Sequence, residues 1–138
     1  MRHKTIEEYI EIIHVLEQEF GRAQTGMIAS QMGVKPPSIT EMLQKLEREG
    51  LIQYESYNGA ILTATGNKLA QELMQRHRIL ADLLEILGID RDRAEEDACR
   101  IEHHISPETL QRLELFLEFA RSDPATTDAI RRFRSLCL

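Results

Sequence analysis

The sequence predicts a mainly α-helical chain with one β-hairpin, because the period of its apolar residues changes once along its length. Apolar residues recur at spacings of three and four over most of the 138 residues, which is the period of an amphipathic helix. Between residues 51 and 63 two short β-prone runs replace that period. Proline, capping residues and glycine stand at the expected starts and ends of the helical stretches.

Three helices are expected before the hairpin. Thr5 can cap the first helix, and a second short helix fits residues 25–32. Pro36 and Pro37 open a third helix, since proline suits a first helical turn, and this helix stops at Gly50. The apolar stripe of the first helix consists of Ile6, Tyr9, Ile10, Ile13, Leu16 and Phe20.

The hairpin follows these helices directly. Its two runs flank Asn58-Gly59, a pair that favours a two-residue turn. Two short helices joined by a tight turn, followed by a hairpin, indicate a winged helix-turn-helix domain, which we assign to residues 1–64. The same small fold also serves protein contacts, so the fold alone leaves the partner open.

Residues 65–138 predict a second, all-helical domain. It contains more leucine and isoleucine than one small domain needs to bury, which favours a dimer interface there. A long helix is expected up to Gly88, and another from about Arg91 to His104. Two more helices begin where a capping residue precedes proline. These two starts are Ser106-Pro107 and Asp123-Pro124.

Composition is that of an ordinary soluble globular protein, with 42% hydrophobic and 29% charged residues. No apolar run approaches the ~18 residues that a membrane span needs, and the first residues lack the features of a signal peptide. We therefore expect a cytoplasmic protein. Cys99 and Cys137 are too few for a disulfide scaffold, so Cys99 is expected to be a free thiol or a ligand.

The formal net charge of -6 counts against nucleic-acid binding, because DNA-binding domains are more often basic. Two bound divalent cations would add about four positive charges and remove most of this deficit. The alternative is that solvated helix faces carry the acidic residues and that DNA plays no part. Charge alone favours that alternative.

The third helix nevertheless carries residues that can contact DNA. In a helix-turn-helix unit the second helix of the pair enters the major groove with its N-terminal residues at the base edges. Ser38 and Gln44 can hydrogen-bond to bases or phosphates, and Lys45 and Arg48 can reach phosphates. The expected DNA-contacting residues of this helix and the hairpin tip are Lys35, Pro36, Pro37, Ser38, Thr40, Glu41, Gln44, Lys45, Arg48, Tyr57 and Asn58.

Six metal-capable side chains occur in three groups along the chain. Two glutamates are three residues apart, so they lie on one side of the first helix. A cysteine, a glutamate and a histidine near residue 100 share one helical face, and such a donor set suits a transition metal. The six residues are Glu8, Glu11, His77, Cys99, Glu102 and His103.

Each of these residues also has an ordinary structural explanation. Glutamates near a helix N-terminus favour the helix dipole and are usually only solvated. His77 lies on a leucine stripe and can be a core histidine, and Cys99 can be a small buried hydrophobe. Their joint occurrence beside a winged helix is what favours a metal site.

Five short motifs, spread over nearly the whole chain, resemble one known family. They are EEYIEII at 7–13, KPPSITEMLQKLEREGLI at 35–52, LTATG at 62–66, QRHRIL around His77 and CRIEHHIS at 99–106. In these motifs and in the order of its elements the chain resembles the diphtheria toxin repressor family of metal-dependent transcription regulators. The most similar branch is the short manganese transport regulators, which lack an additional C-terminal SH3-like domain.

The resemblance implies a homodimeric repressor that binds operator DNA when loaded with metal and controls genes of metal uptake. It also implies two metal ions per subunit, with Glu11 and Glu102 bridging both sites. The first site would comprise Glu8, Glu11, His77 and Glu102. The second would comprise Glu11, Cys99, Glu102 and His103. Since the first two glutamates belong to the DNA-reading domain, metal would fix that domain against the second one and couple metal binding to DNA binding.

Two residues depart from the manganese branch. Glu8 stands where aspartate is usual there, and Cys99 stands where glutamate is usual, whereas the iron-sensing branch has cysteine at that position. The softer thiolate favours Fe(II), Co(II), Ni(II) or Zn(II), while the carboxylates leave Mn(II) open. We expect Mn(II) or Fe(II), with a slight preference for Fe(II).

Two other functions fit parts of the sequence. One is a winged-helix regulator that senses a small organic ligand without metal. The other is an enzyme, because Glu11 and His14 resemble half of a di-iron carboxylate motif. A ferritin-like site needs two such pairs, and no nucleotide-binding or nucleophile motif is present. The sequence therefore predicts a metal-activated repressor and no enzyme, with operator DNA and a second copy as partners and neither a membrane nor a small-molecule substrate.

Overall fold

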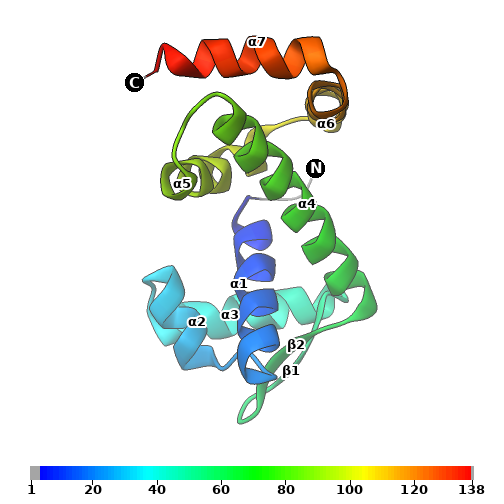
Figure 1. Ribbon diagram of the computed structural model, residues 1–138. Coiled ribbons are helices and arrows are strands. Elements are labelled where there is room, and N and C mark those ends of the chain that lie inside the picture. Colours follow the sequence, from blue (N-terminus) through cyan, green and yellow to red (C-terminus); the bar gives the residue numbers. More distant parts are fainter. Residues whose placement is uncertain (1–3, 138) are drawn as a thin grey trace. The chain divides into compact units, whose positions relative to one another are not determined.

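The computed structural model describes residues 4–137, which form two compact units that divide between Leu73 and Met74. Within these residues there are seven α-helices, one 3₁₀ turn and one antiparallel hairpin (Figure 1). The first unit holds α1 (Lys4–Phe20), α2 (Thr25–Met32), α3 (Pro36–Arg48), β1 (Ile52–Glu55), β2 (Gly59–Leu62) and the first turns of α4 (Ala64–Ile86). The second unit holds the rest of α4, α5 (Arg91–Ile101), the 3₁₀ turn (Glu102–His104), α6 (Pro107–Ser122) and α7 (Pro124–Ser135). The predicted mainly helical fold and its order of elements are confirmed.

The first unit is organised around the apolar face of α1. Ile10 and Ile13 are fully buried, as predicted from the stripe, whereas Phe20 at the end of the helix is 59% exposed. Helix α1 packs on α2 and β2, and α3 packs on α2 and β1. Each fully buried aliphatic side chain contributes about 1.5–3 kcal/mol, so this shared core holds the three helices and the hairpin together.

The hairpin differs in one detail from its prediction. Its loop has three residues, 56–58, because Gly59 already pairs with Glu55 as the first residue of β2. The prediction of a two-residue turn at Asn58-Gly59 is therefore wrong. Gly59 has a φ of 84°, and a Cβ there would lie 2.5 Å from the Ala23 carbonyl oxygen. Glycine is needed at this position for its backbone conformation and for the close approach of the chain before α2.

Helix α4 contributes to both units. Its first turns place Leu69, Ala70 and Leu73 in the core of the first unit, and its later turns belong to the second. The domain boundary that the sequence predicts between residues 64 and 65 remains a prediction. None of the described helices is long and apolar enough to cross a membrane.

The second unit has a smaller core and well-capped helices. Leu80, Ala81 and Ala98 form its buried centre. Ser106 and Asp123 accept hydrogen bonds from the backbone amides three residues later, which confirms the predicted starts of α6 and α7. The helix expected from Arg91 to His104 ends sooner, because its last three residues form the tighter 3₁₀ turn.

Gly66 provides a test of how the hairpin joins α4. A Cβ at this position would lie 2.0 Å from the Leu51 carbonyl oxygen, whereas nothing lies within 4 Å of a Cβ at Gly26 in α2. We expect Gly66→Ala to lower the free energy of unfolding by about 1–3 kcal/mol or more, as in overpacked cores. Gly26→Ala is the matched control, and it should be neutral or stabilising by up to about 1 kcal/mol. Urea denaturation of both variants checks this, and equal midpoints would contradict it.

Candidate metal centre and DNA-binding surface

Glu102 lies at the centre of the predicted ligands in the second unit. Its side chain is fully buried in the 3₁₀ turn. One carboxylate oxygen, Oε2, lies 3.0 Å from His77 Nδ1, and the other, Oε1, lies 3.4 Å from His103 Nε2. Arg76 donates a hydrogen bond of 2.8 Å from Nη1 to the Glu102 carbonyl oxygen. The turn that tightens the end of α5 is therefore fixed to α4 by both the side chain and the backbone of Glu102.

Cys99 joins this group from the preceding turn of α5. The thiol is exposed, which disagrees with the interpretation of Cys99 as a small buried hydrophobe. Its sulfur lies within 4.8 Å of a carboxylate oxygen of Glu102. The second unit thus brings together four of the six predicted ligands, which are His77, Cys99, Glu102 and His103.

The spacing of these donors fits a divalent cation. Atoms ~2.1 Å from one ion lie ~3.0–3.4 Å apart between octahedral and tetrahedral angles. The two histidine–carboxylate separations at Glu102, 3.0 and 3.4 Å, fall at these two limits. Imidazole, carboxylate and thiolate together are the donor set of a transition-metal site.

Glu95 is a member of this cluster that the sequence prediction missed. Its Oε2 contacts His77 Nε2, and its Oε1 lies 2.9 Å from Arg91 Nη2. The hydrogen bond with His77 is the main reason that the pKa of Glu95 lies below its usual value. Glu95 precedes Cys99 by four residues, so the same helical-face argument applied one turn earlier would have found it.

The other two predicted ligands, Glu8 and Glu11, belong to the first unit. Both are half-buried on α1, where their spacing of three residues places them on one side of the helix. His14, one turn after Glu11, is buried.

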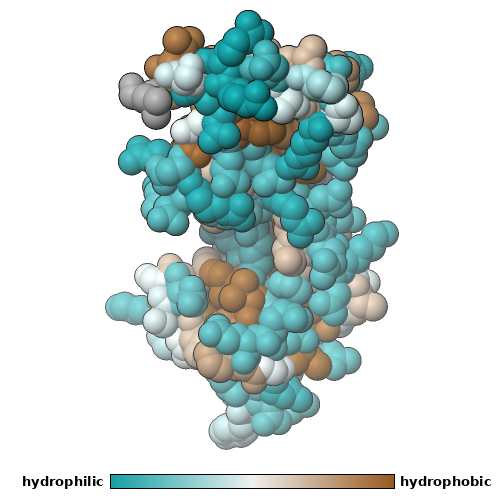
Figure 2. Space-filling model, in the orientation of Figure 1, coloured by the Kyte–Doolittle hydropathy of each residue, from teal (hydrophilic) through white to brown (hydrophobic). Residues whose placement is uncertain are grey.

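The face of α3 opposite the core is available to DNA. Ile39, Leu43 and Leu46 are fully buried, which turns the residues between them outward. Ten of the eleven predicted DNA-contacting residues are exposed, and Thr40 is half-buried with its hydroxyl donating to the Pro36 carbonyl oxygen at 3.3 Å. The exposed residues are Lys35, Pro36, Pro37, Ser38, Glu41, Gln44, Lys45, Arg48, Tyr57 and Asn58. On the face seen in Figure 2, hydrophilic side chains cover the hairpin end of the first unit.

Some of the acidic residues have structural roles in the first unit. Glu47 accepts a hydrogen bond of 2.9 Å from the Tyr54 backbone amide and so ties α3 to β1. Glu17 accepts one of 3.1 Å from the Leu62 backbone amide and ties α1 to β2. Glu17 and Glu47 therefore help to orient the predicted recognition helix and wing within the first unit.

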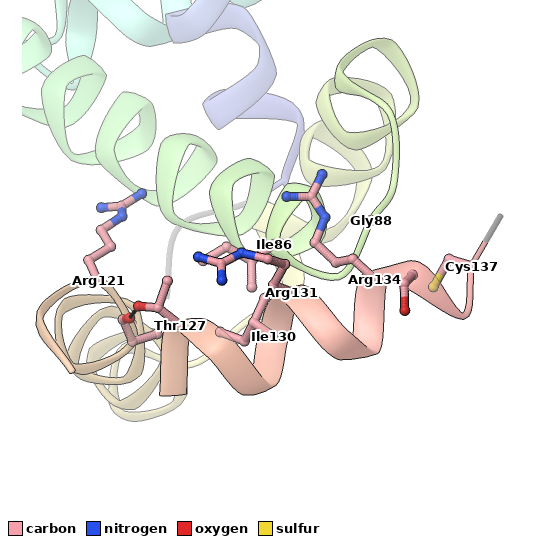
Figure 3. Close-up of a pocket in the computed structure, with 10 residues that line it drawn as sticks. Ile86, Gly88, Arg121, Thr127, Ile130, Arg131, Arg134 and Cys137 are labelled. Carbon is pink, nitrogen blue, oxygen red and sulfur yellow. Dashed lines mark hydrogen bonds between the residues drawn. The ribbon is translucent and has the colours of Figure 1, made fainter. Parts of the chain in front are cut away.

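A separate cavity of about 700 Å³ lies between the end of α4, α6 and α7. Arg121, Arg131 and Arg134 extend across it from α6 and α7 (Figure 3). None of the described residues lining this cavity is a predicted metal ligand. The cavity is therefore distinct from the cluster around Glu102.

The winged helix, its exposed recognition helix and a helical unit with nitrogen, oxygen and sulfur donors are together typical of a metal-dependent transcriptional regulator. Two family profiles match the chain. They are the iron dependent repressor N-terminal DNA binding domain over residues 1–60, and the iron dependent repressor metal binding and dimerisation domain over residues 63–131.

Individual relatives agree with this class. The HTH-type transcriptional regulator MntR of Shouchella clausii strain KSM-K16 is 35% identical over 130 residues, which are 94% of this chain and 91% of the relative. The MntR of Geobacillus thermodenitrificans strain NG80-2 is 34% identical over 130 residues, 94% and 92% of the two proteins. The crystal structure of ScaR with bound Zn²⁺ matches with a TM-score of 0.68 and 32% identity, and the match covers 83% of this chain and 54% of that one.

The chain therefore belongs to the iron-dependent repressor family, which confirms the resemblance to the diphtheria toxin repressor family. It is a metal-dependent transcriptional repressor with a DNA-binding and a dimerisation domain, and not an enzyme. The alternative of a regulator that senses an organic ligand without metal is not favoured by these matches.

His103 and His104 provide a matched test of the cluster. The His103 side chain is 2% exposed beside Glu102, whereas His104 is exposed. We expect His103→Ala to weaken metal binding by more than about 100-fold, beyond the effect of outer contacts, and His104→Ala to leave it unchanged. Competition with a metal-sensitive fluorescent chelator measures both affinities. Equal affinities of the two variants would remove His103 from the ligand set.

Proposed function

We propose that this protein represses genes of metal uptake by binding their operator DNA when each subunit holds two ions of Mn(II) or Fe(II). The observation that carries the proposal is the fully buried carboxylate of Glu102 between His77 and His103, in a chain whose other unit is a winged helix. A repressor that acts on operator DNA works in the cytoplasm.

The ligand sets follow the resemblance to the family. We assign Glu8, Glu11, His77 and Glu102 to the first ion. We assign Glu11, Cys99, Glu102 and His103 to the second. The separations of Glu102 from His77 and from His103 support these assignments, since the nitrogen and oxygen atoms of each pair are spaced as two donors to one ion are.

Coupling to DNA would arise because the ligands come from both units. A bound divalent cation supplies positive charge that several carboxylates can share. Glu8 and Glu11 belong to the winged-helix unit, and the other four ligands belong to the second unit. Joint ligation by residues of both units restricts the orientation of the winged helix, so less ordering remains to be done when DNA binds. Coupling of about 1–3 kcal/mol, or about 5–150-fold in affinity, is typical of such linked sites.

The identity of the metal depends most on Cys99. Its exposed thiol would act as a thiolate ligand and favours Fe(II), whereas Glu8 and Glu11 are hard ligands that also accept Mn(II). The MntR relatives and the solved manganese regulator SloR support Mn(II) as the other candidate.

Contact with DNA would be made by the exposed face of α3 and the hairpin tip. Lys45 and Arg48 lie on this face near the end of α3 and would meet phosphates. Ser38 and Gln44 would contact base edges. Tyr57, which is 94% exposed at the tip of the hairpin, would lie against the DNA backbone or minor groove.

The homodimer would bury an apolar face of the second unit. Leu115, Phe116 and Phe119 on α6 and Phe133 on α7 are each about half-exposed in the single chain. Apolar side chains of this size are unusual on the surface of a monomer when they are grouped. We assign this group of four residues to the contact with the second copy.

The first prediction from this function concerns DNA affinity. We expect the affinity for a palindromic operator of the family type, with half-sites one helical turn apart, to rise about 5–150-fold when Mn(II) or Fe(II) is added without oxygen. Fluorescence anisotropy measures this affinity. Glu11→Ala should remove the increase and leave the apo affinity unchanged. Equal affinity in chelator and in metal would contradict a metal switch.

The second prediction concerns Cys99. Cys99→Glu replaces a soft ligand by a hard one, so it should move the ranking of activating metals towards Mn(II). Cys137→Ser is the control, because Cys137 lies outside the proposed ligand set. DNA binding titrated with each metal gives the ranking. An unchanged ranking in Cys99→Glu would show that the thiolate does not set the preference.

A further inference from the structure

The His77 imidazole lies between two carboxylates. Its Nδ1 is 3.0 Å from Oε2 of the buried Glu102, and its Nε2 contacts Oε2 of Glu95. The two carboxylates are not equivalent. Glu102 is fully buried and belongs to the proposed ligand set, whereas Glu95 is about one-third exposed one helical turn before Cys99.

The chemistry of histidine assigns different roles to the two contacts. A neutral imidazole has one nitrogen that donates an N–H and one that offers a lone pair. A metal-binding histidine uses the lone pair for the metal and commonly donates its other N–H to a carboxylate, which fixes the tautomer and the ring orientation. The tautomer in which Nε2 donates to Glu95 leaves the lone pair on Nδ1, the nitrogen that faces Glu102.

Glu95 is itself held in place. Arg91 binds Oε1 of Glu95 through Nη2 at 2.9 Å, which leaves Oε2 for His77. The other terminal nitrogen of Arg91, Nη1, binds Glu85 on α4 at 2.9 Å. Both oxygens of Glu95 are therefore occupied, and the chain of contacts runs from α4 through Arg91 and Glu95 back to His77 on α4.

We propose that Glu95, oriented by Arg91, is a positioning residue that holds His77 with its proton on Nε2 and its Nδ1 lone pair directed at the metal site. This inference rests on the proposed function, which makes His77 and Glu102 ligands. It assigns to Arg91 and Glu95 a role in metal affinity that the sequence pattern did not indicate.

The experiment compares single variants of the full chain with Zn(II) as a diamagnetic probe. Glu95→Ala should weaken Zn(II) binding by about 10–100-fold, the usual effect of losing an outer partner of a ligand. Glu95→Gln keeps an oxygen acceptor and should recover part of that loss. Glu96→Ala removes the same charge from an exposed position of α5 and should leave the affinity unchanged.

A purely structural role of Glu95 is separated by the His77 ring itself. ¹⁵N NMR of the Zn(II)-loaded wild type should show a protonated Nε2 whose proton exchanges slowly, and a metal-bound Nδ1. In Glu95→Ala the Nε2 proton should exchange fast even where circular dichroism shows an unchanged fold. Zn(II) bound through Nε2 in the wild type would overturn the inference.

The variant His77→Ala separates a failure of the positioning role of Glu95 from a failure of the assignment of His77 as a ligand. If His77→Ala weakens Zn(II) binding and neither Glu95→Ala nor Glu95→Gln does, the positioning role is wrong and the ligand set stands. If His77→Ala also binds Zn(II) as the wild type does, the assignment of His77 as a ligand is wrong, and the positioning role fails with it.

Discussion

The buried carboxylate of Glu102 is the constraint on which the second unit depends. Removing a carboxylate from water costs several kcal/mol unless it is paired and hydrogen-bonded. Here His77 and His103 flank its two oxygens, and Arg76 holds its backbone carbonyl. These contacts are made where α5 ends at Ile101 and the chain forms the 3₁₀ turn. The same arrangement that surrounds the buried carboxylate with imidazole nitrogens brings together the predicted donors of a transition-metal site.

The first unit shows how an acidic chain can carry a DNA-reading surface. Glu17 and Glu47 accept backbone hydrogen bonds that tie helices to the hairpin strands, so they act inside the unit. The exposed face of α3 retains Lys45 and Arg48. Some acidic residues thus have structural roles, while basic residues stay exposed on α3. The net charge of -6 is therefore a poor guide to whether the chain binds DNA.

Local signals predicted most of the fold, and tertiary contacts decided what they missed. Proline is the first residue of α3, α6 and α7, and Ser106 and Asp123 cap the last two helices; these signals act within one turn, so the sequence predicted those helix starts correctly. The sequence assigned Gly59 to the turn because an Asn-Gly pair is typical of turns. The close approach of Gly59 to the Ala23 carbonyl oxygen, which also requires glycine, involves a residue far away in the sequence. Glu95 could have been placed on the helical face of Cys99 from its spacing, but its contact with His77 depends on how α5 packs on α4. The four predicted ligands of the second unit do lie together. Family resemblance indicated all four positions, and helical spacing indicated the three in α5 and the turn after it; their role as ligands stays a prediction.

Positive coupling between metal binding and DNA binding is tested most directly by its reciprocity. Two ligands binding to one protein must affect each other by the same factor. We therefore expect the affinity for Mn(II) or Fe(II), titrated anaerobically by calorimetry, to rise when operator DNA is present, by the same factor by which the metal raises DNA affinity. A metal affinity that is identical with and without operator DNA would contradict the account.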